Sequence, residues 1–567
     1  MYKVLLLSQD NDNRSFLSVT RSLGKHNIII HTASYNKYSS TVCSRYIKKR
    51  YFLSEYSAHP EQCKNEIIEL LKLENYTLVL PCDDLSAIPL QHHQNELEKH
   101  SIIYTLNSKA YDTVKNKHET TLLASSLEIN VPKSILLEKQ VHIKNIIDQF
   151  SYPIVLKPLS SFDEKSSERH NVIIIHDENT LKTELKLMLY NSPVQIQSYF
   201  DGTGMAVSLL SNNGETLIAS QHKRVHEPFT GGGSSYRTSL PINDELLNAA
   251  KKMIKALKYT GVAMFEFKYN LSTKKWALLE INGRFWGSLP LAISAGIDYP
   301  YLLFLTLLNK PLPLHKIVYK PNIYQRNLES DMYWYSDAIL NNSKEELLAH
   351  GYTYKKLALE SIRLLTFRDK IDSFSLIDPC PFISEIKNII SHVLYIIFKK
   401  IRLRFFRNKF IRQQYKKKLL LKLSKAKSIV FVCKGNICRS PFAQLAAKKL
   451  WPSISEINST GFYKNIKRSP PEIAIKSAFQ LTIDLSNHRS TLIDIKQIKK
   501  SDLIFYFDEE NRAELYKEFA IYKHKMYPLS LLSENFSVEI EDPIDKNESD
   551  FLETYQEIYD LIKNTTI

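Results

Sequence analysis

The segment CKGNICRS, at residues 433–440, combines residue types that can carry out chemistry on a phosphate group. It follows an apolar run and precedes a helical pattern, and a loop between a strand and a helix directs backbone N–H groups and a helix N-terminus at one point. Such a loop binds anions and stabilises a cysteine thiolate, while an arginine can hold two phosphate oxygens at once. The segment therefore predicts that Cys433 attacks phosphorus while Arg439 holds the phosphate oxygens. The C-x5-R spacing by itself fits a buried cysteine in a tight turn equally well.

A second group of polar residues lies on two expected strands, AMFEFKYN at 263–270 and WALLEINGRF at 276–285. Because side chains alternate along a strand, Glu266 and Glu280 share a face if the two strands pair. Carboxylate oxygens and an amide oxygen, here supplied by Asn282, suit Mg²⁺ and the phosphates of ATP. The pattern indicates a site for magnesium and a nucleotide, although carboxylates on strands are also common on protein surfaces.

Several cationic residues can complete this nucleotide site. Lys157 ends the strand-like run YPIVLKP, Lys117 lies on a preceding helical stretch, and both can neutralise phosphates. Arg284 lies two residues beyond Asn282 on the same strand face and can bind phosphate or a developing anion. The glycine-rich segment TGGGSS, at 230–235, provides a mobile lid in this interpretation.

The elements that must position these residues follow an α/β alternation. Residues 1–100 predict a parallel sheet flanked by helices. The expected strands are VLLL at 4–7, IIIH at 28–31 and LVLPCDD at 78–84, and the expected helices span 13–24 and 61–73. The first strand leads into SQDNDN rather than a glycine-rich turn, so the sequence does not support dinucleotide binding. A second alternation predicts strands at 428–433 and 503–507 and a final helix at 549–562.

The length and composition predict several folded domains. The chain has 567 residues, of which 44% are hydrophobic and 24% charged, and this excludes a disordered chain. No continuous apolar run reaches the roughly 18 residues that span a bilayer, since the longest runs lie at 301–308 and 392–398. The first residues predict a strand rather than a signal peptide. Four of the six cysteines are scattered and only Cys433 and Cys438 lie close together, as C-x4-C, so they form neither a disulfide framework nor a zinc finger; this favours a reducing, cytoplasmic setting.

The formal net charge of +16 is concentrated in one segment. No acidic residue lies between Glu385 and Glu456, while 18 basic residues do. The rest of the chain is near neutral, so the protein is not a general nucleic-acid binder. Within this segment apolar residues recur at helical spacing, namely Ile390, Leu394, Ile397, Ile401 and Phe405. Three interpretations stay open: a linker helix packed on a neighbouring domain, an interfacial helix on anionic lipid, and, least favoured, a nucleic-acid contact.

The last part of the chain resembles the low-molecular-weight protein tyrosine phosphatase family. The similarity rests on the full CKGNICRS string, STG at 459–461, SNHRS at 486–490 and SDLIFYFDEENRAEL at 501–515. The resemblance implies that Cys433 is the nucleophile and Arg439 binds phosphate, while Ser440 stabilises the thiolate. It implies that Asn436, supported by His488, braces the loop. It also implies that Asp542, of a late Asp-Pro, protonates the leaving oxygen before water hydrolyses the cysteinyl-phosphate.

Departures from the family pattern leave two alternatives open. Ile544 follows Asp542-Pro543, where many family members have an aromatic residue, so a phosphomonoester other than phosphotyrosine remains an alternative substrate. No cysteine follows Cys438, which disfavours the thioredoxin-coupled arsenate reductases that share the fold. Under oxidation Cys438 either forms a protective disulfide with Cys433 or stays an inert loop thiol.

Residues 1–325 resemble the ATP-grasp superfamily, close to the biotin carboxylase and carbamoyl-phosphate synthase branch. The most specific stretch is LLEINGRFWGSLPLAISAGIDYP at 278–300. The resemblance implies ATP and Mg²⁺, with Mn²⁺ as an alternative, and a metal held by Glu266, Glu280 and Asn282. The nucleotide ligands that it implies are Lys117 and Lys157 on the phosphates, Arg284 on phosphate or acyl-phosphate, and Gln197 and Gly202 of QSYFDGTG at the adenine pocket. The implied reaction activates a carboxylate as an acyl-phosphate, which an amine then captures.

We therefore expect an α/β protein with four parts. They are a pre-ATP-grasp α/β domain, an ATP-grasp α+β domain, a helical basic linker and a parallel-sheet phosphatase domain, at 1–104, 105–325, 326–426 and 427–567. The expected function combines an ADP-forming carboxylate–amine ligase with a protein tyrosine phosphatase. The alternatives are a phosphatase regulated by a non-catalytic ATP-binding module and a phosphatase for non-protein phosphomonoesters. Besides these substrates we expect an anionic membrane surface as a partner of 390–423, no specific nucleic acid, and a cytoplasmic location, peripheral at the inner membrane face.

Overall fold

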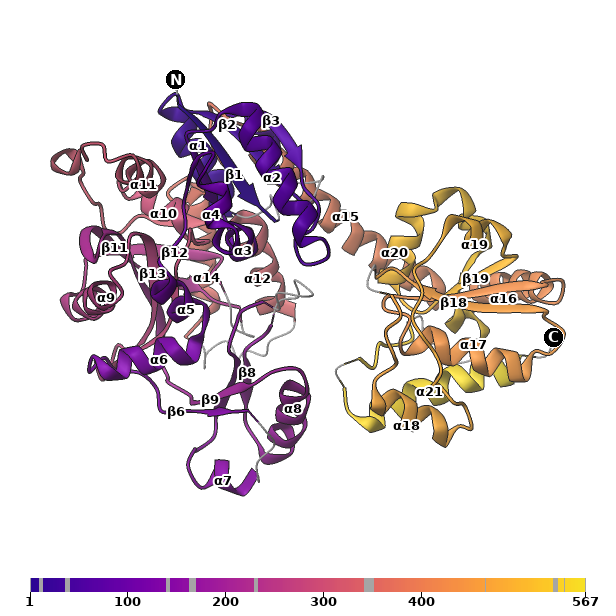
Figure 1. Ribbon diagram of the computed structural model, residues 1–567. Helices are drawn as coiled ribbons and strands as arrows, with labels where there is room; N and C mark the ends of the chain where they lie inside the picture. The colour runs from indigo at the N-terminus through magenta and orange to yellow at the C-terminus, as the bar shows by residue number, and fades with distance from the viewer. Residues whose placement is uncertain are drawn as a thin grey trace. The chain divides into compact units, whose positions relative to one another are not determined.

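The computed structural model describes residues 2–9, 14–35, 41–138, 143–162, 170–228, 233–340, 351–463, 466–533, 539–544 and 546–565. It divides into two compact units, Met1–Ile389 and Ile390–Ile567 (Figure 1). Each unit is built from its own sheets and its own buried apolar clusters. The predicted boundaries at residues 104, 325 and 426 stay predictions.

The first unit begins with a five-stranded parallel sheet in the order β3-β2-β1-β4-β5. Its strands are β1 (Lys3–Ser8), β2 (Ile29–Ser34), β3 (Ile47–Phe52), β4 (Leu78–Pro81) and β5 (Ile102–Ile103). The associated helices are α1 (Arg14–Lys25), α2 (Pro60–Glu74), α3 (Asp84–His92) and α4 (Gln94–Leu97). The expected parallel sheet with flanking helices is confirmed, because β1 is apolar and buried between helices on both faces.

A small antiparallel sheet follows, in the order β6-β9-β7-β8. Its strands are β6 (Ser134–Leu137), β7 (Ile154–Pro158), β8 (Ile173–Ile175) and β9 (Val194–Ser198). The neighbouring helices are α5 (Ser108–Lys115), α6 (Lys117–Ser126), α7 (Ile143–Ile147) and α8 (Glu178–Asn191). The expected strand YPIVLKP is β7, and Lys157 lies near its end.

The largest sheet has seven strands in the order β14-β13-β10-β11-β12-β15-β16. They are β10 (Thr203–Asn212), β11 (Glu215–His226), β12 (Tyr236–Leu240), β13 (Gly261–Tyr269), β14 (Trp276–Asn282), β15 (Tyr324–Arg326) and β16 (Lys370–Ile371). Apolar side chains of β10 and β13 share one buried cluster with α9 (Asp244–Ala256), α10 (Leu289–Ser294) and α11 (Tyr299–Leu307). Both faces of β10 and most of β13 are buried, since consecutive residues such as Val262 and Ala263 belong to this cluster.

Residues 326–389 belong to the first unit. Strand β16 extends the large sheet, and α12 (Leu328–Leu340) and α14 (Tyr354–Leu365) lie between β15 and β16 in the chain. The buried Arg326 pairs with Asp331 and Asp369, which ties β15 to this segment. The structure also joins Cys43 to Cys380 in a disulfide, which the scattered spacing of the cysteines did not suggest.

The second unit contains a four-stranded parallel sheet in the order β18-β17-β19-β20. Its strands are β17 (Ser428–Cys433), β18 (Glu456–Gly461), β19 (Leu503–Tyr506) and β20 (Met526–Pro528). The helices are α16 (Lys409–Leu423), α17 (Arg439–Leu450), α18 (Glu472–Gln480), α19 (Ile495–Lys500), α20 (Glu509–Glu518) and α21 (Glu548–Lys563). The expected α/β class, with a parallel sheet in the last domain, is confirmed.

Helix α15 (Cys380–Arg407) begins in the first unit and ends in the second. Within the part of the chain that the structure describes, it is the one helix whose length and composition would allow it to cross a membrane. The sequence predicted no spanning segment because its continuous apolar runs are short, whereas an 18-residue window of this helix tolerates up to two charged residues and has a mean hydropathy of 1.2.

Candidate functional sites

The segment between β17 and α17 forms a loop around a cysteine. Strand β17 ends at Cys433 and α17 begins at Arg439, so the strand–loop–helix arrangement predicted from the sequence is present. Cys433 is buried, and its Sγ accepts a hydrogen bond from the backbone N–H of Asn436 at 3.2 Å. Its Sγ also lies 3.0 Å from the hydroxyl of Ser440. Donors that converge on sulfur stabilise its anionic form, which is the form that acts as a nucleophile.

Asn436 holds the loop in place with hydrogen bonds in several directions. Its side-chain NH₂ group donates to the hydroxyls of Ser440 and Ser459, both at 2.9 Å. Its side-chain oxygen Oδ1 accepts from the Thr491 N–H at 2.9 Å. The backbone of Asn436 has a φ of 52°, a left-handed conformation that asparagine tolerates better than most residues. The ring Nε2 of His488 lies 2.8 Å from the backbone carbonyl oxygen of Asn436, which is the support that the family resemblance implied.

Gly461, at the end of β18, permits the close approach of this loop. A Cβ atom at Gly461 would lie 2.9 Å from the backbone N of Asn436 and 2.9 Å from the carbonyl oxygen of Lys434. These contacts are shorter than real Cβ atoms make, and both partners are backbone atoms that cannot rotate away. The glycine of the STG segment is therefore required by packing against the loop.

Arg439 is a buried cation at the start of α17. Its guanidinium donates to Asp508 at 2.6 Å, to the Ile540 carbonyl oxygen at 2.9 Å, and to Asp542. Burial opposes the charge, but the carboxylates of Asp542 and Asp508 together raise the pKa of Arg439. Its Nε has no hydrogen-bond partner among the described residues, although the side chain is only 1% exposed. An unused buried donor beside the thiol is what an oxyanion site requires.

The two glutamates of the first unit face each other across paired strands. Antiparallel β13 and β14 place Glu266 directly opposite Glu280, as the alternation predicted. The Asn282 amide lies 3.2 Å from Glu266, and Arg224 of β11 forms an ion pair with the same carboxylate. Burial and the neighbouring Glu280 raise the pKa of Glu266, against the pull of Arg224.

The predicted cations lie around these carboxylates. Lys117, the first residue of α6, has its Nζ 4.0 Å from a Glu280 oxygen. Burial lowers the pKa of Lys157 to about 8, with Glu280 acting in the opposite direction. Strand β14 ends at Asn282, so Arg284 lies beyond it rather than on its face as expected; it pairs with Asp84, the first residue of α3, at 2.7 Å. The described residues contain no cluster of three or more His, Cys, Asp or Glu side chains that would hold a metal by themselves. Two carboxylates and an amide fit Mg²⁺, which takes its remaining ligands from water and phosphate.

A cavity of about 100 Å³ gathers four of the predicted residues. Its lining includes Lys117, Glu280, Asn282 and Arg284, together with Asp84, Ser160 and Phe162. Gln197, on β9, and Gly202, just before β10, do not line it, and their role at an adenine pocket stays a prediction. Part of the expected lid TGGGSS, residues 230–232, lies outside the described residues.

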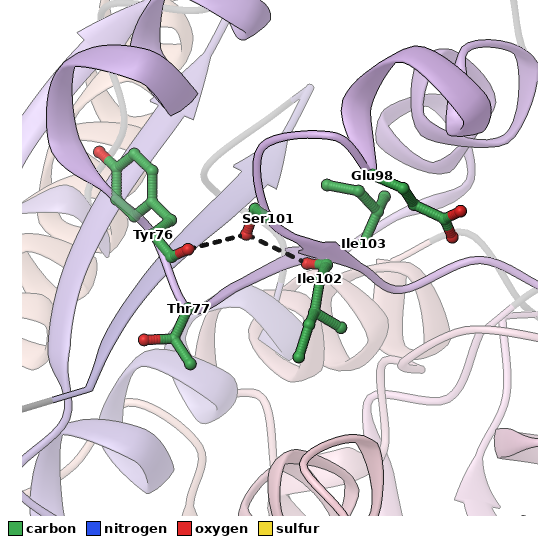
Figure 2. Close-up of a pocket in the computed structure, with 6 residues that line it drawn as sticks. All are labelled: Tyr76, Thr77, Glu98, Ser101, Ile102 and Ile103. Atoms are coloured by element: carbon green, nitrogen blue, oxygen red, sulfur yellow. Dashed lines mark hydrogen bonds between the residues drawn. The ribbon is translucent and has the colours of Figure 1, made fainter.

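A larger hollow of about 540 Å³ lies at the edge of the first sheet, beside β5 (Figure 2). It is lined by Tyr76, Thr77, Glu98, Ser101, Ile102 and Ile103, and Figure 2 shows Ser101 bonded to backbone carbonyl oxygens. Its one ionisable acid, Glu98, has no neighbouring cation in the lining. Its lining contains no cysteine, lysine or arginine.

The sequence analysis missed several residues that the structure places at these sites. Asp508 supports Arg439, and its position before α20, where its side chain accepts from Asn511 N–H, is a helix-capping signal that could have identified it. Arg468 donates to the Gly435 carbonyl oxygen, and no local pattern indicates that contact. In the first unit the missed residues are Arg224, which pairs with Glu266, and Asp84, which pairs with Arg284.

Comparison with known proteins gives the class of each half. A family model for low molecular weight phosphotyrosine protein phosphatase matches residues 428–566, and a model described as ATP-grasp in the biosynthetic pathway with Ter operon matches 191–327. The low molecular weight phosphotyrosine protein phosphatase of Sus scrofa is 32% identical over 140 residues, which cover 23% of this chain and 88% of that protein. The chain thus belongs to the low molecular weight phosphotyrosine protein phosphatase family, with an ATP-grasp region before its phosphatase domain.

The relatives of the first unit match less of their own length. The D-aspartate ligase of Enterococcus faecium (strain Aus0004) is 21% identical over 226 residues, which cover 36% of this chain and 53% of that protein. The chain therefore spans about half the length of this curated relative. A crystal structure of an L-amino acid ligase from Bacillus licheniformis is 13% identical, covers 56% of this chain and 75% of that chain, and has a TM-score of 0.44.

Replacing Asn436 by alanine should weaken the phosphatase unit. The change leaves the Thr491 N–H without its acceptor and removes the two bonds that the Asn436 amide donates to the buried Ser440 and Ser459, so we expect a loss of about 1–3 kcal/mol in the stability of this unit. Turnover of p-nitrophenyl phosphate should fall at least tenfold, because the loop that holds Cys433 loses its brace. Thermal melting and steady-state kinetics measure the two effects. Asn458→Ala, on neighbouring β18, is the control; equal behaviour of the two variants would contradict the bracing role.

Proposed function

We propose that this chain is a bifunctional enzyme, with a cysteine phosphatase in its second unit and an ADP-forming carboxylate–amine ligase in its first. The observation that carries the phosphatase half is the buried Cys433, whose sulfur accepts from the Asn436 N–H and lies 3.0 Å from the Ser440 hydroxyl, together with the unused Nε of Arg439. The ligase half rests on the opposed Glu266 and Glu280, with lysines beside them.

The phosphatase reaction would proceed in two displacements. Cys433 Sγ attacks phosphorus and forms an S–P bond while the ester P–O bond breaks, and Asp542 donates its proton to the departing oxygen. Arg439 binds the phosphoryl oxygens, which requires it to release Asp542. Water then attacks phosphorus, loses a proton to Asp542, and inorganic phosphate leaves with the thiolate restored.

A phosphotyrosine protein is the substrate that we favour. Ile544 occupies the position where an aromatic residue was expected. Tyr463 instead lies next to the loop: a Cβ atom built on Gly435 would lie 3.7 Å from the edge of the Tyr463 ring. The ring is 45% exposed and Arg468 lies over it, so it can contact an aryl group at the mouth of the loop. A phosphomonoester outside proteins remains the alternative, and the ratio of kcat/KM for phosphotyrosine peptides to that for alkyl phosphates separates them.

The ligase reaction would begin with a carboxylate oxygen attacking the γ-phosphorus of ATP, so that ADP leaves and an acyl-phosphate forms. An amine then attacks the acyl carbon, phosphate leaves, and the amine nitrogen loses a proton. Mg²⁺ supplies charge neutralisation on the phosphates when it is bound. Lys117 and Lys157 bind phosphate oxygens, and Arg284 binds the developing anion. The alternative is a grasp half that binds ATP without turnover and regulates the phosphatase; ADP release that depends on both a carboxylate and an amine would exclude it.

Helix α15 supports an interfacial membrane contact as a further part of this function. One face of the helix docks on the second unit, through Arg402 on Glu509 and Lys399 on Glu539. The opposite face exposes apolar side chains at helical spacing, namely Ile390, Val393, Leu394, Ile397, Phe398, Ile401 and Phe405. With no acidic residue from 386 to 455, this face matches an anionic lipid surface in charge and polarity. We therefore propose that this face of the helix contacts an anionic membrane surface.

Replacing Cys433 by serine should abolish hydrolysis of p-nitrophenyl phosphate. A serine hydroxyl stays protonated in this loop, so the S–P bond cannot form and turnover should fall by at least a thousandfold. Stopped-flow release of p-nitrophenol measures it. Cys438→Ser serves as the control for removing a buried loop thiol, and a Cys433 variant that retains turnover would refute the nucleophile.

Replacing Glu280 by glutamine should eliminate magnesium-dependent nucleotide binding and spare the phosphatase. The change removes one of the two facing carboxylates without altering side-chain size. Calorimetric titration with Mg-AMPPNP and a phosphatase assay on the same sample give both readouts. Glu245→Gln, on α9, is the matched control. Unchanged nucleotide affinity would remove Glu280 from the metal site.

Replacing Ile397 and Ile401 by aspartate should release the chain from anionic vesicles. Two charges in the apolar face oppose both burial and the attraction to lipid, so binding should fall at least tenfold. Flotation with vesicles of phosphatidylcholine with or without phosphatidylserine measures it. The control is Phe479→Asp, at an exposed apolar position on α18. If the wild-type chain does not bind anionic vesicles at low salt, the membrane proposal is wrong and the linker interpretation holds.

A further inference from the structure

One face of helix α15 contacts the phosphatase unit through polar side chains. Tyr395, Lys399 and Arg402 follow one another at the i, i+4 and i+7 positions of this face. Tyr395 lies near three glutamates of the unit, and burial together with their negative charges raises its pKa to about 12. These glutamates are Glu509 and Glu510 of α20 and Glu539, which precedes the acid loop. The family model begins at residue 428, so this face of α15 lies outside the matched phosphatase domain.

Arg402 holds both ends of the turn that joins β19 to α20. Its guanidinium donates at 2.6 Å to the hydroxyl of Tyr506, the last residue of β19. It also donates at 2.6 Å to the carboxylate of Glu509, the first residue of α20. Between these two residues lies Asp508, which accepts from Arg439 at 2.6 Å. A side chain of α15 therefore fixes the turn that supplies one of the two carboxylates on Arg439.

Lys399 holds a second segment, which leads to Asp542, against the same turn. Its Nζ lies 3.0 Å from Oε1 of Glu539, and this oxygen also accepts from the backbone N–H of Glu509 at 3.1 Å. A carboxylate at the start of a helix binds an N–H group that has no partner within the helix. Glu539 thus links Lys399 of α15 to the first turn of α20, three residues before the proton donor.

Asp542 needs such support because it loses a partner during the proposed reaction. In the structure Arg439 donates to Asp542, but in the first displacement the phosphoryl oxygens take over this guanidinium. Other contacts must then hold the segment. They include the Ile540 N–H, which donates to the Phe507 carbonyl oxygen at 2.9 Å, and the contact from Lys399. A proton donor accelerates the reaction only while it stays within hydrogen-bond reach of the leaving oxygen.

We infer that Lys399 and Arg402 are positioning residues of the phosphatase, which keep Asp542 aligned with the leaving oxygen once the phosphoryl group has displaced it from its arginine. This rests on the proposed phosphatase function. Neither side chain touches the substrate. Lys399 acts through Glu539, and Arg402 acts through the turn between β19 and α20. A helix that precedes the matched domain is therefore part of what makes its proton transfer efficient.

The test compares kcat/KM of the full chain for phenyl phosphate and for p-nitrophenyl phosphate. Phenolate is the more basic leaving group, so its departure depends more on a positioned acid. In Lys399→Gln and in Arg402→Gln we expect kcat/KM to fall at least about tenfold for phenyl phosphate and less than about threefold for p-nitrophenyl phosphate. Lys399→Arg should restore the value for phenyl phosphate to within about threefold of the wild type, because it keeps a cation beside Glu539.

Three controls separate positioning from general charge and from unfolding. Lys400→Gln and Arg404→Gln each remove a cation from an exposed position of the same helix, and both should leave the two kcat/KM values unchanged. The melting temperature of Lys399→Gln should stay within about 4 °C of the wild type, because a partly exposed ion pair adds little stability. Asp542→Asn provides the reference pattern, with its larger loss on phenyl phosphate.

The outcomes separate this inference from the proposed function. Failure of the wild type to hydrolyse either ester would overturn the phosphatase function and the inference with it. Equal slowing of the two esters in Asp542→Asn would overturn the assigned acid, and again the inference with it. A selective loss in Asp542→Asn that is absent from Lys399→Gln and Arg402→Gln would overturn the positioning role alone. Equal behaviour of Lys399→Gln and Lys400→Gln would also overturn it, because general charge would then explain the effect.

Discussion

A buried positive charge needs a partner at every stage of a reaction, and this constraint shapes both sites. Arg439 is buried at the start of α17, and the carboxylates of Asp508 and Asp542 compensate it. Arg224 likewise pairs with Glu266 in the large sheet. In each case one of the partners is assigned a chemical role of its own, as proton donor or as metal ligand. Under the proposed function, binding of a phosphoryl group or a metal would exchange these partners.

The two units bring their charged groups together in different ways. In the second unit a single loop between β17 and α17 supplies the thiol, the backbone donors and the arginine, so the chemistry is encoded in eight consecutive residues. In the first unit the groups come from separate strands and helices, and only the fold brings Lys117, Glu280 and Arg284 to one cavity. A local site can be identified from a short motif, whereas a dispersed one depends on the register of its sheet.

This difference explains what could be predicted from the sequence. The strands β1 and β17 are apolar and buried on both faces, and their positions were confirmed, as was the facing of Glu266 and Glu280. Strand β3, with the sequence IKKRYF, was missed because it is polar and largely exposed at the sheet edge. The pairing of Cys43 with Cys380 joins residues 337 positions apart, and no local pattern encodes such a contact.

The most direct measurement is a crystal structure of the chain with Mg-AMPPNP and orthovanadate. The account predicts vanadate bonded to Cys433 Sγ with the Arg439 guanidinium on its oxygens, and magnesium between Glu266 and Glu280 with Arg224 moved off Glu266. Vanadate or nucleotide bound elsewhere, with the Arg439–Asp542 and Arg224–Glu266 pairs intact, would contradict it.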